Sequence, residues 1–449
     1  MKKRGQLLLY KMIDKNTVII NQLSQNRADT VGLCRYLRNE KIAMEALISE
    51  QTKKVNVLAQ GKHVLVLNDT TEINYQSHIN FLNKNDCDLG PVGNNTDIGY
   101  FLHPGLVIDT QTAMGIGYSY IHIWNRQWDK RNKIQRDYKG QSIEEKESYR
   151  WIDCAQKSKD TLSDAHTITI VADRESDMYE EFVAVPDTRT HLLIRSKQNR
   201  NLAQGSTLYE QLENTAVSHR QTLKVRTTKN HTGRATIMQV KFTRVKIKRP
   251  SQLNKTIPEY VELNVVEAKE DMTLVPAGEK PIHWVLLTTH QITNPGQALQ
   301  IITWYAMRWQ IELLFSTLKT AGLNIEASEI ESGKALKKLC VMALAVSLQI
   351  NQLRQARQDT TEIPAAILFT KEQITFLKML IPKYEGKTKK QTNQFKENTL
   401  AWAAWLIARL GGWKGYQSES PPGNKTFKWG LDRFNASYDG YLIALKLCA

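Results

Sequence analysis

Two short apolar runs that each end in an acid constrain the fold of this chain more than any other feature. Residues 63–69 read His-Val-Leu-Val-Leu-Asn-Asp, and residues 166–173 read His-Thr-Ile-Thr-Ile-Val-Ala-Asp. Short apolar runs of this kind are typical of buried strands. A helix is expected between them, over residues 144–159, and another follows the second run at 178–183. Strand, acid and helix in this order indicate an α/β layer.

The remaining sequence changes character several times. At 449 residues the chain is long enough for two to four structural units. The first 60 residues are polar and helix-like, and strands are expected at 103–112 and 113–124. Apolar and polar side chains alternate over residues 236–248, which indicates an inserted antiparallel sheet with one solvated face. Beyond about residue 330 the pattern is mostly helical, with a charged linker at 383–396.

The charge is strongly basic and unevenly distributed. The formal net charge is +16, and residues 214–258 contain eleven Lys or Arg and no Asp or Glu. Such a run is either a solvated surface or a footprint for nucleic acid, and its length and single sign favour nucleic acid. A membrane surface is less favoured, because the run alternates like a strand instead of forming an amphipathic helix. The five scattered cysteines predict small buried side chains in a reducing compartment.

Four polar residues in the middle of the chain predict a functional helix face. Asn294 and Pro295 have the residue types of a helix start, and Tyr305, Arg308, Glu312 and Lys319 follow. At about 100° per residue these four lie within roughly 60° of one another. The apolar stripe of the same helix is expected about 100° away. It would consist of Leu299, Ile302, Ala306, Trp309 and Leu313.

The acids at the two strand ends are candidate partners for Glu312. Taken singly, Asp69 reads as a turn residue and Asp173 as part of a surface ion-pair cluster. Taken together with Glu312, they predict a metal site, because a buried carboxylate is costly unless a cation compensates it. Three converging carboxylates can hold two Mg²⁺ ions that act on a phosphodiester.

With these residues in place, the chain resembles the DDE transposases of bacterial insertion sequences that carry the YREK signature, the group typified by the transposon-five transposase. Tyr305, Arg308, Glu312 and Lys319 have the spacing of that signature. The resemblance covers about residues 28–440, with the motifs in the expected order. The other matching segments are Asp69-Thr70-Thr71, Asp173-Arg174-Glu175, Glu145–Ser148 with Trp151, Arg195-Ser196-Lys197, Trp284–Thr288, Arg409–Gly412 and Trp429-Gly430.

The resemblance implies an RNase H-like catalytic core interrupted by a β insertion, and two-metal cleavage and strand transfer of transposon ends. Asp69, Asp173 and Glu312 would be the metal-binding triad, holding two Mg²⁺ ions that Mn²⁺ can replace. The implied DNA contacts are Tyr305, Arg308, Lys319, Trp284, Arg195 and Lys197. Trp284 would take up a flipped base, the alternative being a core tryptophan at a strand start. For Trp309 and His103, core packing and a buried structural role are the favoured interpretations.

The implied domains are an N-terminal end-binding region (1–60), an RNase H-like core in two parts (61–190 and 293–330), a β insertion (191–292) and a helical dimerisation region (331–449). The implied partners are the terminal inverted repeats, target DNA and a second copy of the chain in a synaptic complex. No signal peptide or membrane span is expected, so the chain is predicted to be cytoplasmic and nucleoid-associated.

The N-terminal part departs from the family. Residues 36–39 match the later part of the end-binding domain, but its usual Gly-Asp opening segment is missing. Three functions therefore stay open. The first is a cut-and-paste transposase, and the second is a shortened, non-transposing inhibitor that binds DNA and dimerises. The third is a plain RNase H-like nuclease, which gives no reason for the helical C-terminal region.

Overall fold

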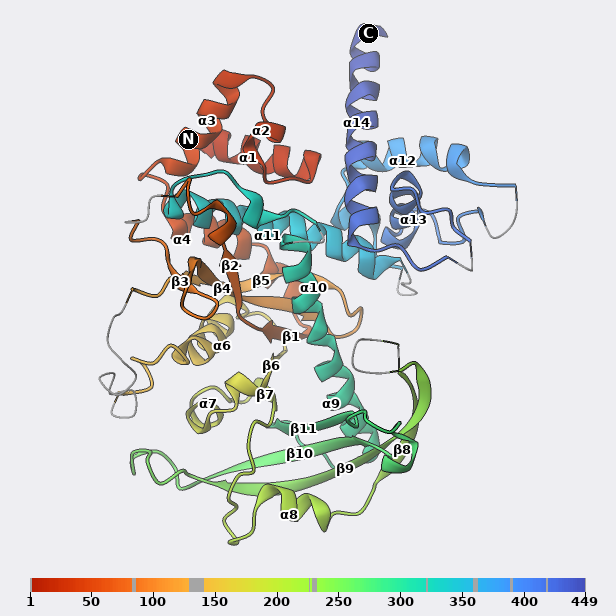
Figure 1. The fold of residues 1–449 in the computed structure, drawn as a ribbon. Coiled ribbons are helices and arrows are strands. Elements are labelled where there is room, and N and C mark those ends of the chain that lie inside the picture. The colour runs from red at the N-terminus through yellow and green to blue at the C-terminus, as the bar shows by residue number, and fades with distance from the viewer. Residues whose placement is uncertain are drawn as a thin grey trace.

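The computed structural model describes residues 2–82, 86–128, 141–225, 227, 232–319, 322–357, 362–387, 391–416 and 419–448. The first 60 residues are helical, as predicted, and lie beside the C-terminal helices at one end of the molecule (Figure 1). These N-terminal helices are α1 (Lys2–Lys15), α2 (Ile20–Leu23), α3 (Arg27–Arg38), α4 (Met44–Thr52) and α5 (Val55–Ala59).

A mixed sheet runs through the described part of the chain. Its central strands follow the order β5-β4-β1-β6-β7, in which β5, β4 and β1 are antiparallel and β1, β6 and β7 are parallel. The strands are β1 (His63–Asn68), β2 (Thr71–Asn74), β3 (Gly90–Val92), β4 (Asp97–Asp109), β5 (Gly115–Trp124), β6 (Thr167–Ala172), β7 (Thr190–Arg195), β8 (His219–Val225), β9 (Arg234–Lys248), β10 (Tyr260–Glu270) and β11 (His283–Thr288).

The inserted strands β8–β11 extend this sheet instead of forming a separate one. They are antiparallel, as expected, but β11 pairs with β7, so the hydrogen bonding is continuous from the central strands to β8. Figure 1 shows β8–β11 at the end of the molecule farthest from both termini. Leu193–Arg195 at the end of β7 pair with Leu286–Thr288, the second half of β11, and Leu286 is opposite Arg195.

Helices cover both faces of the sheet, because its central strands are apolar on both sides. On β1, Val64 and Val66 face one core, whereas Leu65 and Leu67 face the other. The remaining helices are α6 (Tyr149–Thr161), α7 (Tyr179–Ala184), α8 (Leu208–Glu213), α9 (Pro295–Met307), α10 (Trp309–Leu318), α11 (Gly333–Ala356), α12 (Lys371–Tyr384), α13 (Leu400–Leu410) and α14 (Asn424–Cys448). The first core also contains residues of α5–α8, and the second contains residues of α1–α3 and of α9–α14.

The functional helix differs from its prediction in length and in phase. It starts as predicted, since the Asn294 side chain accepts a hydrogen bond from the Gln297 amide and Pro295 occupies the first turn. It then divides at Arg308 into α9 and α10 and ends at Leu318. The predicted apolar stripe is wrong, because Trp309 is 58% exposed whereas Tyr305 is buried. Burial here follows contact of α9 with β9 and β10, which a helical wheel of apolar residues does not include.

The basic run at residues 214–258 is partly neutralised in the fold by acidic side chains from outside the run. The facing strand β10 and its neighbourhood supply acids to it: Arg234 pairs with Glu270 and Glu279, and Arg244 pairs with Glu262. Lys241 and Lys246 also lie near acids of β10. The run therefore forms cross-strand ion pairs over much of β9, while Arg220 and Lys224 on β8 are exposed. Arg226 and Lys229 lie outside the described residues.

Candidate functional site

The first two predicted acids lie side by side at one edge of the sheet. β1 and β6 are parallel neighbours with Leu67 opposite Val171, and Asp69 and Asp173 each come two residues later. The backbone then turns at both positions. Asp69 Oδ1 accepts a hydrogen bond from the Thr70 amide at 2.8 Å, and Asp173 Oδ1 accepts one from the Glu175 amide at 2.8 Å. Each carboxylate thus has one oxygen held by the backbone of its own loop.

Glu312 on α10 joins these acids through Arg308. The Arg308 guanidinium donates to Asp69 Oδ2 at 2.9 Å and to Glu312 Oε1 at 2.5 Å. Burial raises the pKa of Asp69 to about 6, and the Asp173 and Glu312 carboxylates add to the rise, while Arg308 opposes it. The other two carboxylates therefore lie close enough to Asp69 to act on it electrostatically.

The acids fit a divalent metal by donor type and by electrostatics. Mg²⁺ prefers oxygen ligands, and a buried carboxyl with a raised pKa beside two further carboxylates gains from a nearby divalent charge. The side chains are not drawn together in the described structure, where no choice of one carboxylate oxygen from each of the three acids puts all three within 4.8 Å of one another. The Arg308 guanidinium lies between Asp69 and Glu312 and supplies the positive charge there.

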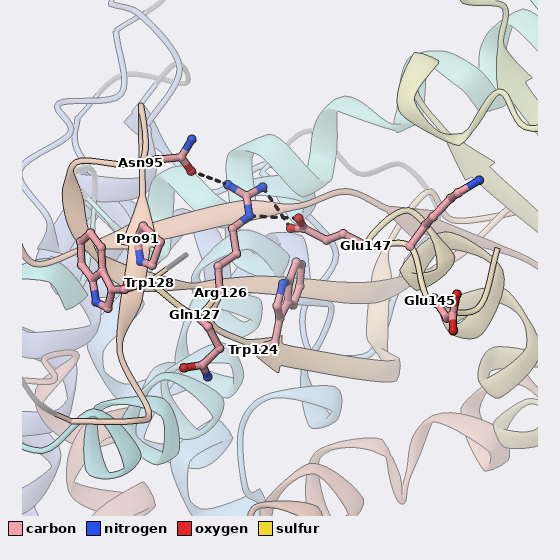
Figure 2. A pocket seen from close by; sticks show the side chains of 9 residues that line it. Pro91, Asn95, Trp124, Arg126, Gln127, Trp128, Glu145 and Glu147 are labelled. Atoms are coloured by element: carbon pink, nitrogen blue, oxygen red, sulfur yellow. Dashed lines mark hydrogen bonds and ion pairs between the residues drawn. The ribbon is translucent and has the colours of Figure 1, made fainter. Parts of the chain in front are cut away.

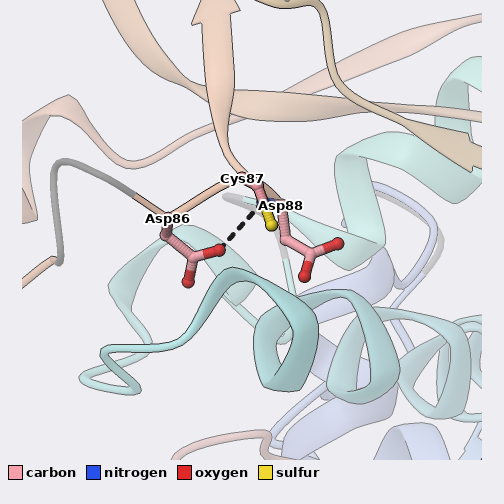
Figure 3. A group of neighbouring side chains, drawn as sticks. All are labelled: Asp86, Cys87 and Asp88. Carbon is pink, nitrogen blue, oxygen red and sulfur yellow. Dashed lines mark hydrogen bonds between the residues drawn. The ribbon is translucent and has the colours of Figure 1, made fainter.

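Within the described residues, that tight spacing is met by Asp86, Cys87 and Asp88, shown in Figure 3. The two aspartate side chains interact with the first turns of α11. Asp86 Oδ2 accepts a hydrogen bond from the Gly333 amide at 2.8 Å, and Asp88 Oδ1 is 3.2 Å from Lys337 Nζ. Cys87 is exposed, so the prediction that the cysteines are buried is wrong for this one. The cluster is accounted for by capping and ion pairing, and we assign no metal to it.

Tyr305, Trp284 and Arg195 meet beside Arg308. Tyr305 is 5% exposed, and its ring packs edge-on against Trp284 with the centroids 5.2 Å apart. Its hydroxyl interacts with the guanidinium groups of Arg195 and Arg308. Arg195 also donates to the His283 carbonyl at 3.0 Å. Because Tyr305 supports both arginines and contacts Trp284, these predicted residues form one continuous group with the acids.

The described contacts of Lys319 and Lys197 are with residues outside that group. α10 ends at Leu318, so the prediction that Lys319 shares a helical face with Glu312 is wrong. Its Nζ lies 3.3 Å from Glu326 Oε1. Lys197 is exposed, and its backbone amide donates to Asp177 Oδ2 at 2.7 Å.

His103 has the structural role that was favoured for it. It is fully buried, its Nδ1 lies 2.9 Å from Thr70 Oγ1, and its ring packs edge-on against Trp151 at 4.7 Å. Burial lowers the pKa of His103 well below its ordinary value.

Sequence reasoning missed Arg150 on α6. Its guanidinium donates to Thr70 Oγ1 at 2.9 Å, to Glu175 Oε2 at 2.7 Å and to the Glu147 carbonyl at 2.9 Å. It therefore contacts both loops that carry an acid of the site. The match of residues 145–148 and Trp151 to a family motif drew attention to this helix, but no local pattern singles out residue 150.

A pocket of about 670 Å³ lies beyond Arg150, between the β3–β4 turn and the segment before α6 (Figure 2). Arg126 crosses it, donating twice to Glu147, at 2.9 and 3.1 Å, and once to Asn95 at 3.3 Å. Trp124 also lines it, and the Arg150 guanidinium carbon is 5.7 Å from the indole centroid. The pocket also contains Lys146 and Glu145, so the charged side chains among its described lining residues balance.

Comparison with known proteins identifies a family for part of the chain. Residues 127–348, just under half of the sequence, match the family model of the Transposase DDE domain. That segment includes Asp173 and Glu312 but begins after Asp69. Among solved structures, the chain is similar to a piggyBac transposase synaptic complex with hairpin DNA. That likeness has a TM-score of 0.37 and 8% identity, covers 98% of this chain and 71% of that one, and is too low to support an argument.

The described residues contain no helix of the length and apolarity that crossing a membrane requires.

Proposed function

We propose that this chain is a DNA transposase that cleaves the ends of its own element and joins them to target DNA. The observation that carries the proposal is that Asp69 and Asp173 follow the ends of two adjacent parallel strands, while Arg308 joins Asp69 to Glu312 on α10. The match of residues 127–348 to the Transposase DDE domain supports the same chemistry. The strand order β5-β4-β1-β6-β7, with three antiparallel strands followed by two parallel ones, supports an RNase H-like core.

In this proposal Asp69, Asp173 and Glu312 hold two Mg²⁺ ions, or Mn²⁺ in their place. The bound ions would activate the attacking hydroxyl and stabilise the leaving oxygen. The chain's own contribution is to hold three carboxylates at the sheet edge and to balance their charge with Arg308. The Tyr305 hydroxyl lies close enough to the Arg308 and Arg195 guanidinium groups to interact electrostatically with both.

The DNA contacts we propose are Arg308 and Arg195 to phosphates, with Tyr305 between them. Arginine suits this role because its planar fork can bind phosphate oxygens in pairs. Trp284 is only partly buried, which leaves part of its ring for a base while Tyr305 supports it from one side. Lys319 and Lys197 would contact the backbone farther away, and Lys319 would exchange its Glu326 partner for phosphate.

We further propose the division into an end-binding region (1–60), a core (61–190 and 293–330), a β insertion (191–292) and a dimerisation region (331–449). The last assignment is supported by α14, which projects from the body (Figure 1) and exposes Ile443, Leu445 and Leu447 near its end. A dimer of this kind would pair two ends in a synaptic complex at the bacterial nucleoid.

The test is Mg²⁺-dependent cleavage of a duplex that carries the terminal inverted repeat found beside the gene. Asp69→Ala, Asp173→Ala and Glu312→Ala should each abolish cleavage, and the wild type should join pre-cut ends to a second duplex. Asp160→Ala is the matched control, because Asp160 is an exposed acid on α6 away from the site. Undiminished cleavage by the triad variants would refute the assignment. Wild-type DNA binding without cleavage would favour the inhibitor, and cleavage without joining would favour the plain nuclease.

A further inference from the structure

The side chain of Arg150 bridges the two loops that carry Asp69 and Asp173. It is 13% exposed, and its Nε and a terminal nitrogen point to different loops, to Thr70 Oγ1 at 2.9 Å and to Glu175 Oε2 at 2.7 Å. The other terminal nitrogen donates to the Glu147 carbonyl, one turn earlier in the chain, at 2.9 Å. The guanidinium is thus fixed on three sides.

The two residues that Arg150 holds are the same two that hold the acids. The Thr70 amide donates to Asp69 Oδ1, and the Glu175 amide donates to Asp173 Oδ1, both at 2.8 Å. One side chain is therefore joined to each aspartate through a single intervening residue. Movement of Arg150 would shift both carboxylates relative to each other, although Arg150 touches neither.

The supports of Arg150 come from different parts of the fold. Thr70 Oγ1 is also 2.9 Å from His103 Nδ1 on β4, and the guanidinium lies over Trp124 on β5 and Trp151 on α6, 5.7 and 5.4 Å from the ring centroids. The planar fork of donors, which lets one side chain hold both loops, is a property that lysine does not share, and arginine packs on aromatic faces more often than lysine does.

From these contacts we propose that Arg150 is a positioning residue for the metal-binding aspartates. It sets the separation of Asp69 and Asp173 by clamping Thr70 to Glu175, and so tunes the affinity of the site for divalent metal. The inference rests on the proposed function, because it takes the two aspartates to be metal ligands. Residues that orient metal ligands typically change metal affinity or activity by about 10- to 100-fold when they are mutated.

The experiment is calorimetric titration of Mn²⁺ into the full chain without DNA, which does not depend on catalysis. Arg150→Ala and Arg150→Lys should each weaken Mn²⁺ binding by about 10- to 100-fold. Arg126→Ala is the matched control, because Arg126 is bound to Glu147 in the same region and contacts neither Thr70 nor Glu175 through a hydrogen bond or ion pair that the structure describes. It should leave Mn²⁺ affinity unchanged.

A second variant guards against loss of folding. The Glu175 side chain is 62% exposed, so Glu175→Ala leaves the core intact and removes only one end of the clamp. It should weaken Mn²⁺ binding in the same direction by about 2- to 5-fold, as expected for a partly exposed ion pair. Thermal unfolding of every variant provides the check that a change in affinity is not a change in folding.

The outcomes separate this inference from the proposed function. If the wild type binds Mn²⁺ and Asp69→Ala does not, but folded Arg150→Lys and Glu175→Ala bind as the wild type does, the positioning role of Arg150 is refuted and the triad stands. If the wild type itself does not bind Mn²⁺, both the triad and the inference are overturned.

Discussion

Glu181 on α7 is a buried acid that ties the stability of this chain to pH. It is fully buried, its Oε2 accepts a 2.6 Å hydrogen bond from Ser176 Oγ, and its Oε1 lacks a partner within the described structure. Burial raises the pKa of Glu181 to about 8 from the ordinary value of 4.5. The folded chain therefore keeps a proton that the unfolded chain loses above pH 4.5.

The sign and size of the effect follow from that difference. Because the folded-state pKa is raised, the stabilisation is complete below pH 4.5 and is lost as pH rises through 8. Each pH unit in this window costs about 1.4 kcal/mol, so the loss between pH 5 and pH 7 is about 2.5 kcal/mol. Glu181→Gln keeps an acceptor for Ser176 and removes the titration. The variant should gain about 2–3 kcal/mol over the wild type between pH 5 and pH 7.

The assay is urea unfolding of both proteins at pH 5, 6, 7 and 8, with the unfolding free energy of the transition that includes α7 taken from its midpoint and slope. Glu180→Gln is the matched control, since Glu180 precedes Glu181 on the same helix and is only partly buried. Its curve should run parallel to that of the wild type. Parallel curves for the wild type and Glu181→Gln would show that the carboxyl does not titrate as its burial requires.

Three further predictions concern charged groups elsewhere in the fold. Arg200→Ala should destabilise the chain by about 3–5 kcal/mol in urea unfolding, because it leaves the fully buried Asp177 carboxylate without the guanidinium that now binds it; an unchanged midpoint would contradict this. Burial lowers the pKa of His290 to about 3, so acidification from pH 7 to 5 should remove up to about 2 kcal/mol through this residue; the change in unfolding free energy between the two pH values should differ by about that amount between the wild type and His290→Asn. Glu326→Gln should tighten DNA binding by about 2- to 5-fold at low salt by releasing Lys319, and a filter-binding assay should find no such gain when Lys319→Ala is also present.

The strands that carry the aspartates could be predicted because their signal is local. β1 and β6 are short apolar runs, and the acid that ends each run is visible in the sequence. Asp69 and Asp173 lie close together because β1 and β6 are parallel neighbours. Paired residues of these strands, such as Leu67 and Val171, are 104 positions apart in the sequence. The sequence predicted that the two acids share a site only through their combination with Glu312 and through the family resemblance.

The side chains that were missed or misplaced depend on contacts between distant segments. Arg150 contacts Thr70 and Glu175, which are 80 and 25 positions away. A wheel drawn through α9 and α10 assumes one uninterrupted helix whose apolar residues face the core, but Tyr305 is buried there and Trp309 is exposed. The face of a helix that is buried depends on the strands that pack against it, and the sequence of the helix alone does not identify those strands.

The contacts of Arg308 explain why the Arg308–Glu312 part of the pattern Tyr305, Arg308, Glu312 and Lys319 was predicted correctly. Its spacing of four positions from Glu312 is the spacing at which helical side chains meet, and the pair lies across the junction of α9 and α10. Removing one member of a partly buried ion pair is costly because the other charge is left uncompensated. With Asp69 on its other side, Arg308 offsets part of the negative charge of the neighbouring acids. The Arg308–Glu312 pair is therefore required by electrostatics before any DNA is bound, whereas Lys319, beyond the end of α10 and paired with Glu326, is under no such requirement.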